Sequence, residues 1–350
     1  MSGAPFAFQL PEDLMAKEPP ERRGIGRDQV RLLVIDRKAK KRLHTRFDRV
    51  GDFLGEGDLI VFNSSRTLPA ALKGCAAERA PCIEARLAEH LPDDTWLVLL
   101  LCEKGDPFAC GLRAGMEINF GEDLTGKVIE RDERIPRLWR IGFSQSGTEL
   151  VDTIYRLGQP VRYEYVSAPW DLDYYQTVYA QEPGSAEMPS AGRAFTWKLL
   201  FELRRRGVET AYIVLHTGLS SYMDDDLDAL HPAGEEEYFI GPDAASKINR
   251  ARREGRRVIA VGTTVVRALE SAADENGLVA SAHAYTRLRI TESHRLKTVS
   301  GLLTGMHEPE ASHLDLLTAF LPPEEIRGAY LEAVERKYLW HEFGDLNLII

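Results

Sequence analysis

The sequence has 350 residues, of which 44% are hydrophobic, and its formal net charge is −10. That length predicts two domains, each with enough apolar residues for its own core, and the acidic balance does not favour a nucleic-acid partner. The first residues lack the basic and apolar regions of a signal peptide, and no apolar stretch approaches the ~20 residues that span a bilayer, so we expect a cytoplasmic protein with no membrane partner.

The first sixty residues alternate strands with turns. Residues 30–36 (VRLLVID) predict a buried strand, and residues 42–47 predict a strand that pairs back on it as a hairpin. Residues 55–58 (GEGD) form a tight turn, and residues 59–62 (LIVF) are a continuous apolar run typical of a buried strand.

Two basic clusters occupy residues 37–42 and 250–257. Either cluster could contact the phosphates of a tRNA. The alternative for each is a solvated surface, a turn in the first case and the exposed face of a helix in the second.

Residues 68–159 differ in their residue pattern from the segments before and after them. Short apolar runs alternate with Gly, Pro and Asp, and no helical pattern is convincing, so we expect an inserted small antiparallel β-barrel domain. All four cysteines, Cys75, Cys82, Cys102 and Cys110, lie in this stretch without C-x-x-C spacing. We therefore expect free thiols and no bound metal.

Helices and strands alternate again after residue 159. Thr196 is a predicted N-cap of a helix that Gly207 ends, and a strand follows at residues 209–215. Asp243 is the predicted cap of a helix that ends near Gly255, before a strand at residues 257–261. This strand–helix–strand order predicts a parallel pair. Residues 1–67 and 160–350 would then form one large α/β domain, with final helices at 265–273 and 324–338.

Two predicted strands end in residues suited to ligand binding. After residues 258–261 come Gly262, Thr263 and Thr264 at the start of a helix, where free amides and the helix dipole favour an anion. The alternative is that a threonine merely caps the helix. His216 follows the strand 209–215, and such a histidine is either a packed core residue or a catalytic group at the carboxyl edge of the sheet.

Several common sites are excluded. The sequence has no G-x-G-x-x-G after a strand, and no Walker A, H-E-x-x-H or G-x-S-x-G motif. Dinucleotide binding, P-loop phosphoryl transfer, zincin chemistry and α/β-hydrolase chemistry are therefore disfavoured.

Taken together, the motifs resemble those of the S-adenosylmethionine:tRNA ribosyltransferase-isomerase family of queuosine biosynthesis. The resemblance runs nearly end to end, in order, through FQLPEDL (8–14), GDLIVFN-SSRTLPA (57–70), YQTVY (175–179), EPG (182–184), PSAG (189–192), LHTGL (215–219), GTTVVRALE (262–270) and FGD (343–345). It implies an α/β domain with a six-stranded β-barrel inserted. It also implies transfer of the ribosyl moiety of S-adenosylmethionine, a co-substrate, onto 7-aminomethyl-7-deazaguanine in tRNA, giving epoxyqueuosine-tRNA and releasing adenine and methionine.

The motif matches also imply a set of site residues. His216 and His307 are the candidate acid/base groups, and Thr263, Thr264 and Arg267 are expected to bind the carboxylate or ribose of S-adenosylmethionine. Tyr175 and Tyr179 are expected to stack on a base. The remaining candidates for substrate binding are Arg66, Gln176, Ala191, Gly192, Gly218 and Gly262.

The chain is a divergent member by this comparison. Ala194 stands where the family pattern has a histidine, residues 234–238 (GEEEY) replace a His-Ser-Glu block, residues 289–293 replace an aromatic-Pro-Gly stretch, and residues 305–309 keep only His307 and Pro309 of another block. Two alternatives follow. One is an S-adenosylmethionine-consuming enzyme that acts on a small molecule or nucleoside, and the other is a non-catalytic S-adenosylmethionine-binding paralogue.

Overall fold

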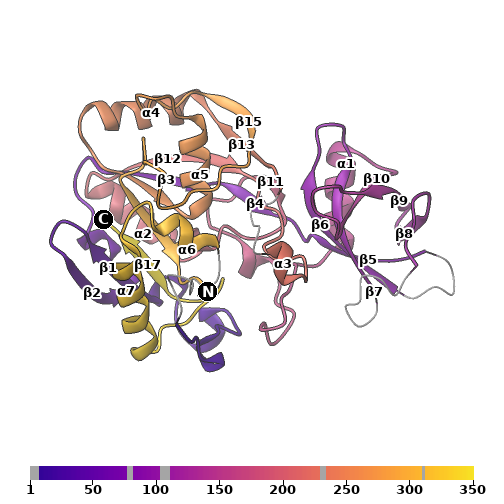
Figure 1. The fold of residues 1–350 in the computed structure, drawn as a ribbon, viewed down its shortest axis with the longest axis horizontal. Coiled ribbons are helices and arrows are strands. Elements are labelled where there is room, and N and C mark those ends of the chain that lie inside the picture. The colour runs from indigo at the N-terminus through magenta and orange to yellow at the C-terminus, as the bar shows by residue number, and fades with distance from the viewer. Residues whose placement is uncertain (1–7, 77–81, 103–110, 229–233, 310–311) are drawn as a thin grey trace.

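The computed structural model describes residues 8–76, 82–102, 111–228, 234–309 and 312–350. Figure 1 shows an α/β body with a separate β-barrel standing beside it. Short strands β4 (Ser65–Thr67) and β11 (Glu182–Ser185), which pair in parallel, lie in the region between the two. The predicted fold class, a large α/β unit with a small antiparallel barrel, is confirmed.

The α/β body is built on one nine-stranded mixed sheet. Its strand order is β15 (Ala282–Thr286), β13 (Glu236–Ile240), β12 (Glu209–Leu215), β3 (Leu59–Asn63), β14 (Val258–Val261), β16 (Gly301–Gly305), β17 (Leu346–Ile349), β1 (Arg31–Asp36) and β2 (Lys41–Arg46). The four strands β12, β3, β14 and β16 run parallel, so their carboxyl ends share one edge. Strands β1 and β2 form the predicted hairpin.

Both faces of this sheet are covered, which explains why its central strands are continuous apolar runs. Along β1, Leu32 and Val34 face a core that includes α2 (Trp197–Arg205), whereas Leu33 and Ile35 face the opposite core. The opposite core contains α4 (Pro242–Arg253), α5 (Thr263–Ala272), α6 (Ser312–Leu317) and α7 (Pro323–Glu335).

The barrel closes in the order β10 (Leu138–Phe143), β7 (Trp96–Cys102), β6 (Cys82–His90), β5 (Ala71–Cys75), β8 (Glu117–Gly121) and β9 (Leu124–Arg131). Helix α1 (Gly147–Leu157) packs Leu150 and Ile154 against the barrel core. The expectation of no helix between residues 68 and 159 is therefore wrong. The helix is a single short one whose N-cap, Ser146, makes no side-chain hydrogen bond, so the usual start signal is weak.

Local predictions elsewhere are confirmed or corrected by specific contacts. Thr196 caps α2 by accepting a hydrogen bond from the Leu199 amide. The N-cap of α4 is Gly241, and Asp243 lies inside its first turn. Strands β12 and β14 run in the same direction as predicted, but they are not a pair because β3, from the start of the chain, lies between them.

The cysteines also differ from expectation. Cys75 and Cys82 are free thiols on neighbouring strands, whereas Cys102 is disulfide-bonded. The expectation of four free thiols is therefore wrong at Cys102, and Cys110 lies outside the described residues. No helix in the described part of the chain is long and apolar enough to cross a membrane.

Candidate functional site at the carboxyl edge of the sheet

The carboxyl ends of β3 and β12 are tied together by one buried amide. The Asn63 side chain donates to the Leu215 carbonyl (2.8 Å) and accepts from the Leu215 amide (3.0 Å). It also accepts from the Ser65 amide at 3.1 Å, which turns the chain from β3 into β4. This clamp fixes the backbone on which His216 sits.

His216 is held by a chain of two buried hydroxyls. Its Nδ1 lies 2.8 Å from Ser65 Oγ, which lies 2.5 Å from Ser185 Oγ. Burial lowers the pKa of His216, and the carboxylate of Glu237 opposes that shift. The imidazole is therefore neutral near pH 7, and in the tautomer whose Nδ1–H donates to Ser65 the Nε2 atom is the one that can take a proton.

Gly184 makes this arrangement sterically feasible. A Cβ on residue 184 would lie 2.5 Å from atoms of the His216 ring, closer than side chains pack. Gly184 therefore lets its loop approach the histidine closely.

A cavity of about 230 Å³ opens beside His216, between the barrel and the α/β body. Gly218 and Pro183 line it from the α/β body, and Trp96 and Leu138 line it from the barrel. Five carboxylates also line it, Glu89, Asp94, Glu235, Glu236 and Glu237. A cavity with this lining favours a ligand that carries positive charge.

Four of these carboxylates have a basic side chain as partner. Glu235 pairs with Arg287 and Glu236 with Arg267, whereas Glu237 lies beside His283 and Asp94 beside His90. Glu89 has no such ion pair within the described residues, and its buried Oε1 has no hydrogen-bond partner there. Burial, opposed in part by Arg134, raises the pKa of Glu89 to about 7. Glu89 can therefore gain or lose a proton near neutral pH.

The start of α5 lies at the same edge. Gly262 has φ +92°, which allows the sharp turn from β14 into the helix, and no side chain caps that helix. Neither threonine is thus a capping residue: Thr263 is 9% exposed, and Thr264 Oγ1 accepts a 3.4 Å contact from Asn63. Ala191 lies beside Gly262, so the two motifs PSAG and GTTVVRALE meet here.

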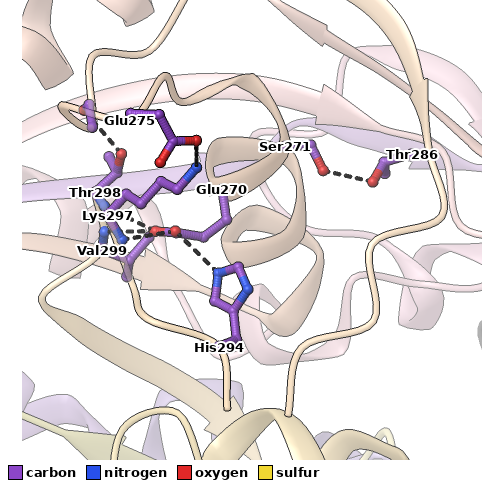
Figure 2. Close-up of polar contacts among 9 residues, drawn as sticks. Glu270, Ser271, Glu275, Thr286, His294, Lys297, Thr298 and Val299 are labelled. Carbon is purple, nitrogen blue, oxygen red and sulfur yellow. Dashed lines mark hydrogen bonds and ion pairs between the residues drawn. The ribbon is translucent and has the colours of Figure 1, made fainter. Parts of the chain in front are cut away.

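Further along α5 the polar motif residues hold the fold. Buried Arg267 pairs with Glu236 and donates to the Leu288 carbonyl at 2.9 Å. Figure 2 shows Glu270, whose carboxylate accepts from the backbone amides of Lys297 (2.8 Å), Thr298 (2.9 Å) and Val299 (3.1 Å). His294 Nε2 lies 3.4 Å from the same carboxylate. Glu270 thereby anchors the segment that enters β16.

His307 lies in a different environment from His216. Its Nε2 bonds Thr304 Oγ1 at 2.8 Å, and its ring stacks on His313 with centroids 4.8 Å apart. Burial together with His313 and His341 lowers the pKa of His307 well below its usual value. The structure therefore gives the two candidate histidines separate hydrogen-bond partners.

The aromatic and amide candidates surround β4. Tyr179 is 4% exposed, and its ring packs on Phe62 while its hydroxyl lies against Gly192. Because of this packing, the Tyr179 ring has no face open to a base. Gln176 clamps Thr67 by accepting from its amide (3.1 Å) and donating to its carbonyl (2.7 Å). Exposed Arg66 lies over the ring of Tyr155, and Tyr175 packs on Phe343.

Both basic clusters lie at the opposite, amino edge of the parallel strands. Arg37 donates to the carbonyl of Ser300, just before β16, and Arg257 pairs with Asp58, just before β3. In Figure 1, β2 lies on the side of the α/β body away from the barrel. In the part of the chain that the structure describes, no group of three or more His, Cys, Asp or Glu side chains could hold a metal ion.

Comparison with known proteins decides the family. The sequence profile of the family described as queuosine biosynthesis protein matches residues 4–349. The S-adenosylmethionine:tRNA ribosyltransferase-isomerase of Carboxydothermus hydrogenoformans is 38% identical over 349 residues, covering 99% of this chain and 98% of the relative. That of Caldanaerobacter subterraneus is 35% identical over 354 residues and covers both chains fully. The chain belongs to this family.

A solved structure of the queuosine biosynthesis family agrees. The S-adenosylmethionine tRNA ribosyltransferase of Thermotoga maritima matches with a TM-score of 0.55 and 28% identity, over 99% of this chain and all of that one.

Sequence reasoning did not single out Ser65, Ser185, Asn63 or Glu89 as site residues. Ser65, Ser185 and Asn63 lie in or beside the motifs that carry the family resemblance, so their position in those motifs was the signal that could have identified them. Glu89 lies in a strand of the barrel, and no pattern in the sequence places it beside His216.

Proposed function

We propose that this chain transfers and isomerises the ribosyl moiety of S-adenosylmethionine onto 7-aminomethyl-7-deazaguanine in tRNA, releasing adenine and methionine. The observation that supports this most strongly is that family motifs far apart in the sequence meet at His216: Gly184 and His216 line one cavity, and Ser65 bonds the His216 ring behind it. A tRNA substrate also requires a cytoplasmic location.

The cavity suits the first chemical step. The sulfonium of S-adenosylmethionine acidifies the adjacent C5′–H, so a modest base can remove that proton. His216 is suited to this role because it is neutral, oriented by Ser65 and beside the cavity. His307 is the weaker candidate because Thr304 already occupies its Nε2.

The cavity carboxylates suit both substrates by charge. A sulfonium and a protonated aminomethyl group are cations, and each is stabilised by nearby carboxylates in a partly desolvated site. Glu89 is the carboxylate suited to accept the proton that the aminomethyl nitrogen must lose before it can act as a nucleophile. Thr264 and the amides after Gly262 are the candidates for the methionine carboxylate.

The experiment is incubation with S-adenosylmethionine, with and without tRNA that carries the deazaguanine base, with adenine and methionine release as the readout. We expect release only with the tRNA. His216→Gln should lose it while retaining a melting-temperature increase with S-adenosylmethionine. Full activity in His216→Gln would assign the base elsewhere.

A second candidate function is favoured by one observation, which is that both basic clusters lie at the sheet edge remote from the cavity. In this second function S-adenosylmethionine is consumed in the same way, but the acceptor is a small molecule. Adenine release with free 7-aminomethyl-7-deazaguanine but not with tRNA would support it. Binding of S-adenosylmethionine without release in either case would indicate a non-catalytic paralogue.

A further inference from the structure

A second hollow, a groove of about 670 Å³, lies between the barrel and residues 158–175. Its barrel wall comes from β5, β6 and α1, and its other wall from residues 158–175. Within the described chain no element covers it. Pro69 and Tyr175 of two family motifs lie in its lining, but the proposed chemistry does not use it.

The groove carries positive charge that is not neutralised locally. Lys73 and Arg162 line it, are exposed, and form no ion pair among the described residues. Arg86 lines it as well and pairs with Glu84 at 2.7 Å, which leaves Asp171 as the other acidic lining residue. The lining thus holds three cationic and two acidic side chains, in a chain whose net charge is −10.

Aromatic rings lie beside these cations. Tyr155, Trp170 and Tyr175 line the groove. Two exposed arginines extend the arrangement at its margin, with Arg66 5.6 Å from the Tyr155 ring and Arg22 5.4 Å from the Trp170 ring. Cations that contact phosphates beside rings that stack on bases are the chemistry by which proteins bind single-stranded RNA.

The groove adjoins the cavity at His216. Leu68 lines the cavity and the next residue, Pro69, lines the groove. Helix α1 likewise lines both hollows, with Leu150 and Val151 lining the cavity and Tyr155 lining the groove. Segments of the chain that line the cavity thus continue directly into segments that line the groove.

We propose that this groove binds the single-stranded anticodon loop of a tRNA, with Lys73 and Arg162 at phosphates and Trp170 as a stacking surface, so that the reacting base reaches the cavity. The inference rests on the proposed function for the identity of the RNA. It assigns the RNA contact to the groove rather than to residues 37–42 or 250–257. In the second of these clusters Arg250, Arg256 and Arg257 already pair with acidic side chains.

The test measures binding of a fluorescently labelled tRNA anticodon stem-loop RNA to the full chain over a series of salt concentrations. The groove variant is Lys73→Glu with Arg162→Glu. The matched control is Lys38→Glu with Lys40→Glu, which makes the same charge change on the β1–β2 hairpin. The groove variant should bind at least tenfold more weakly at low salt, with the slope of log affinity against log salt smaller by about 0.7–0.9 per lost phosphate contact.

Trp170→Leu tests the stacking surface without changing charge. It should weaken binding by roughly 5- to 100-fold, the range for loss of one stacked base, with the salt slope unchanged. Thermal melting checks the fold of each variant, and Lys73→Gln with Arg162→Gln replaces the charge reversal if that variant melts early. Equal weakening in the hairpin control, or wild-type binding by the groove variants, would overturn the proposal.

Adenine release separates this inference from the proposed function. If the protein binds RNA through the groove but never releases adenine, the groove proposal stands and the enzymatic function is rejected. If adenine is released with tRNA and the groove variants release it as fast as the wild type, the enzymatic function stands and the groove proposal is rejected. No RNA binding by the wild type would reject the groove as well.

Discussion

The two edges of the parallel strands carry ionisable groups in contrasting states. At the amino edge Arg257 pairs with Asp58, and Glu270 accepts hydrogen bonds from three backbone N–H groups. At the carboxyl edge His216 is bonded through Nδ1 alone among the described residues, and Glu89, facing the same cavity from the barrel, has an oxygen without a partner there; both groups have shifted pKa values. Groups that are fully partnered stabilise the fold, whereas shifted and incompletely partnered groups mark a reaction site.

The largest expected effect is at the carboxyl edge. His216→Ala should lower the rate of adenine release by about 10²- to 10⁴-fold, the usual contribution of a general base, with little change in melting temperature. Single-turnover assays with saturating substrates measure it. His307→Ala is the matched comparison, and a greater rate loss there would exchange the roles of the two histidines.

Glu270→Gln probes the amino edge. The amide cannot accept all three backbone N–H bonds as a carboxylate does, so the free energy of unfolding should fall by about 2–4 kcal/mol. Glu275→Gln is the control, because Glu275 is 93% exposed beside Lys297 and its ion pair should contribute under about 1 kcal/mol. Chemical denaturation measures both. A loss of turnover without loss of stability would contradict the structural role of Glu270.

Gly184→Ala should damage the site while sparing most of the fold. The added methyl group would displace the His216 ring, and overpacking of this kind costs about 1–3 kcal/mol. We expect a reduced kcat in steady-state assays, with the KM for S-adenosylmethionine less affected. Gly305→Ala should change neither, since no atom lies within 4 Å of its added Cβ.

The smallest effect is a pH dependence. The raised pKa of Glu89, about 7, lies above the 4.5 of the unfolded chain, so the folded state holds this proton more tightly. The free energy of unfolding should therefore fall as pH rises from about 4.5 to about 7, and stay level above that range. Glu89→Gln should remove this loss, on the order of 2 kcal/mol, so its melting temperature should exceed the wild type's by more at pH 8 than at pH 5. Parallel melting curves would contradict the buried, unpaired state of Glu89.

The local sequence determined the elements and the family. Continuous apolar runs gave the central strands, Thr196 and Gly207 gave the limits of α2, and the ordered motifs gave the relationship to the ribosyltransferase-isomerases, because each of these signals acts over a few residues. Helix α1 was missed because its start signal is weak, and the neighbour of β14 was misjudged because β3 arrives from 195 or more positions earlier in the chain.

Only the tertiary structure decided which polar residues share a site. Ser65 and His216 are 151 positions apart and meet because β3 and β12 are adjacent in the sheet. Arg267 of α5 pairs with Glu236 of β13, which lines the cavity, and Glu89 reaches the cavity from the barrel. The energy of a buried charge depends on the partners that the fold brings to it, and those partners are not encoded near it in the sequence.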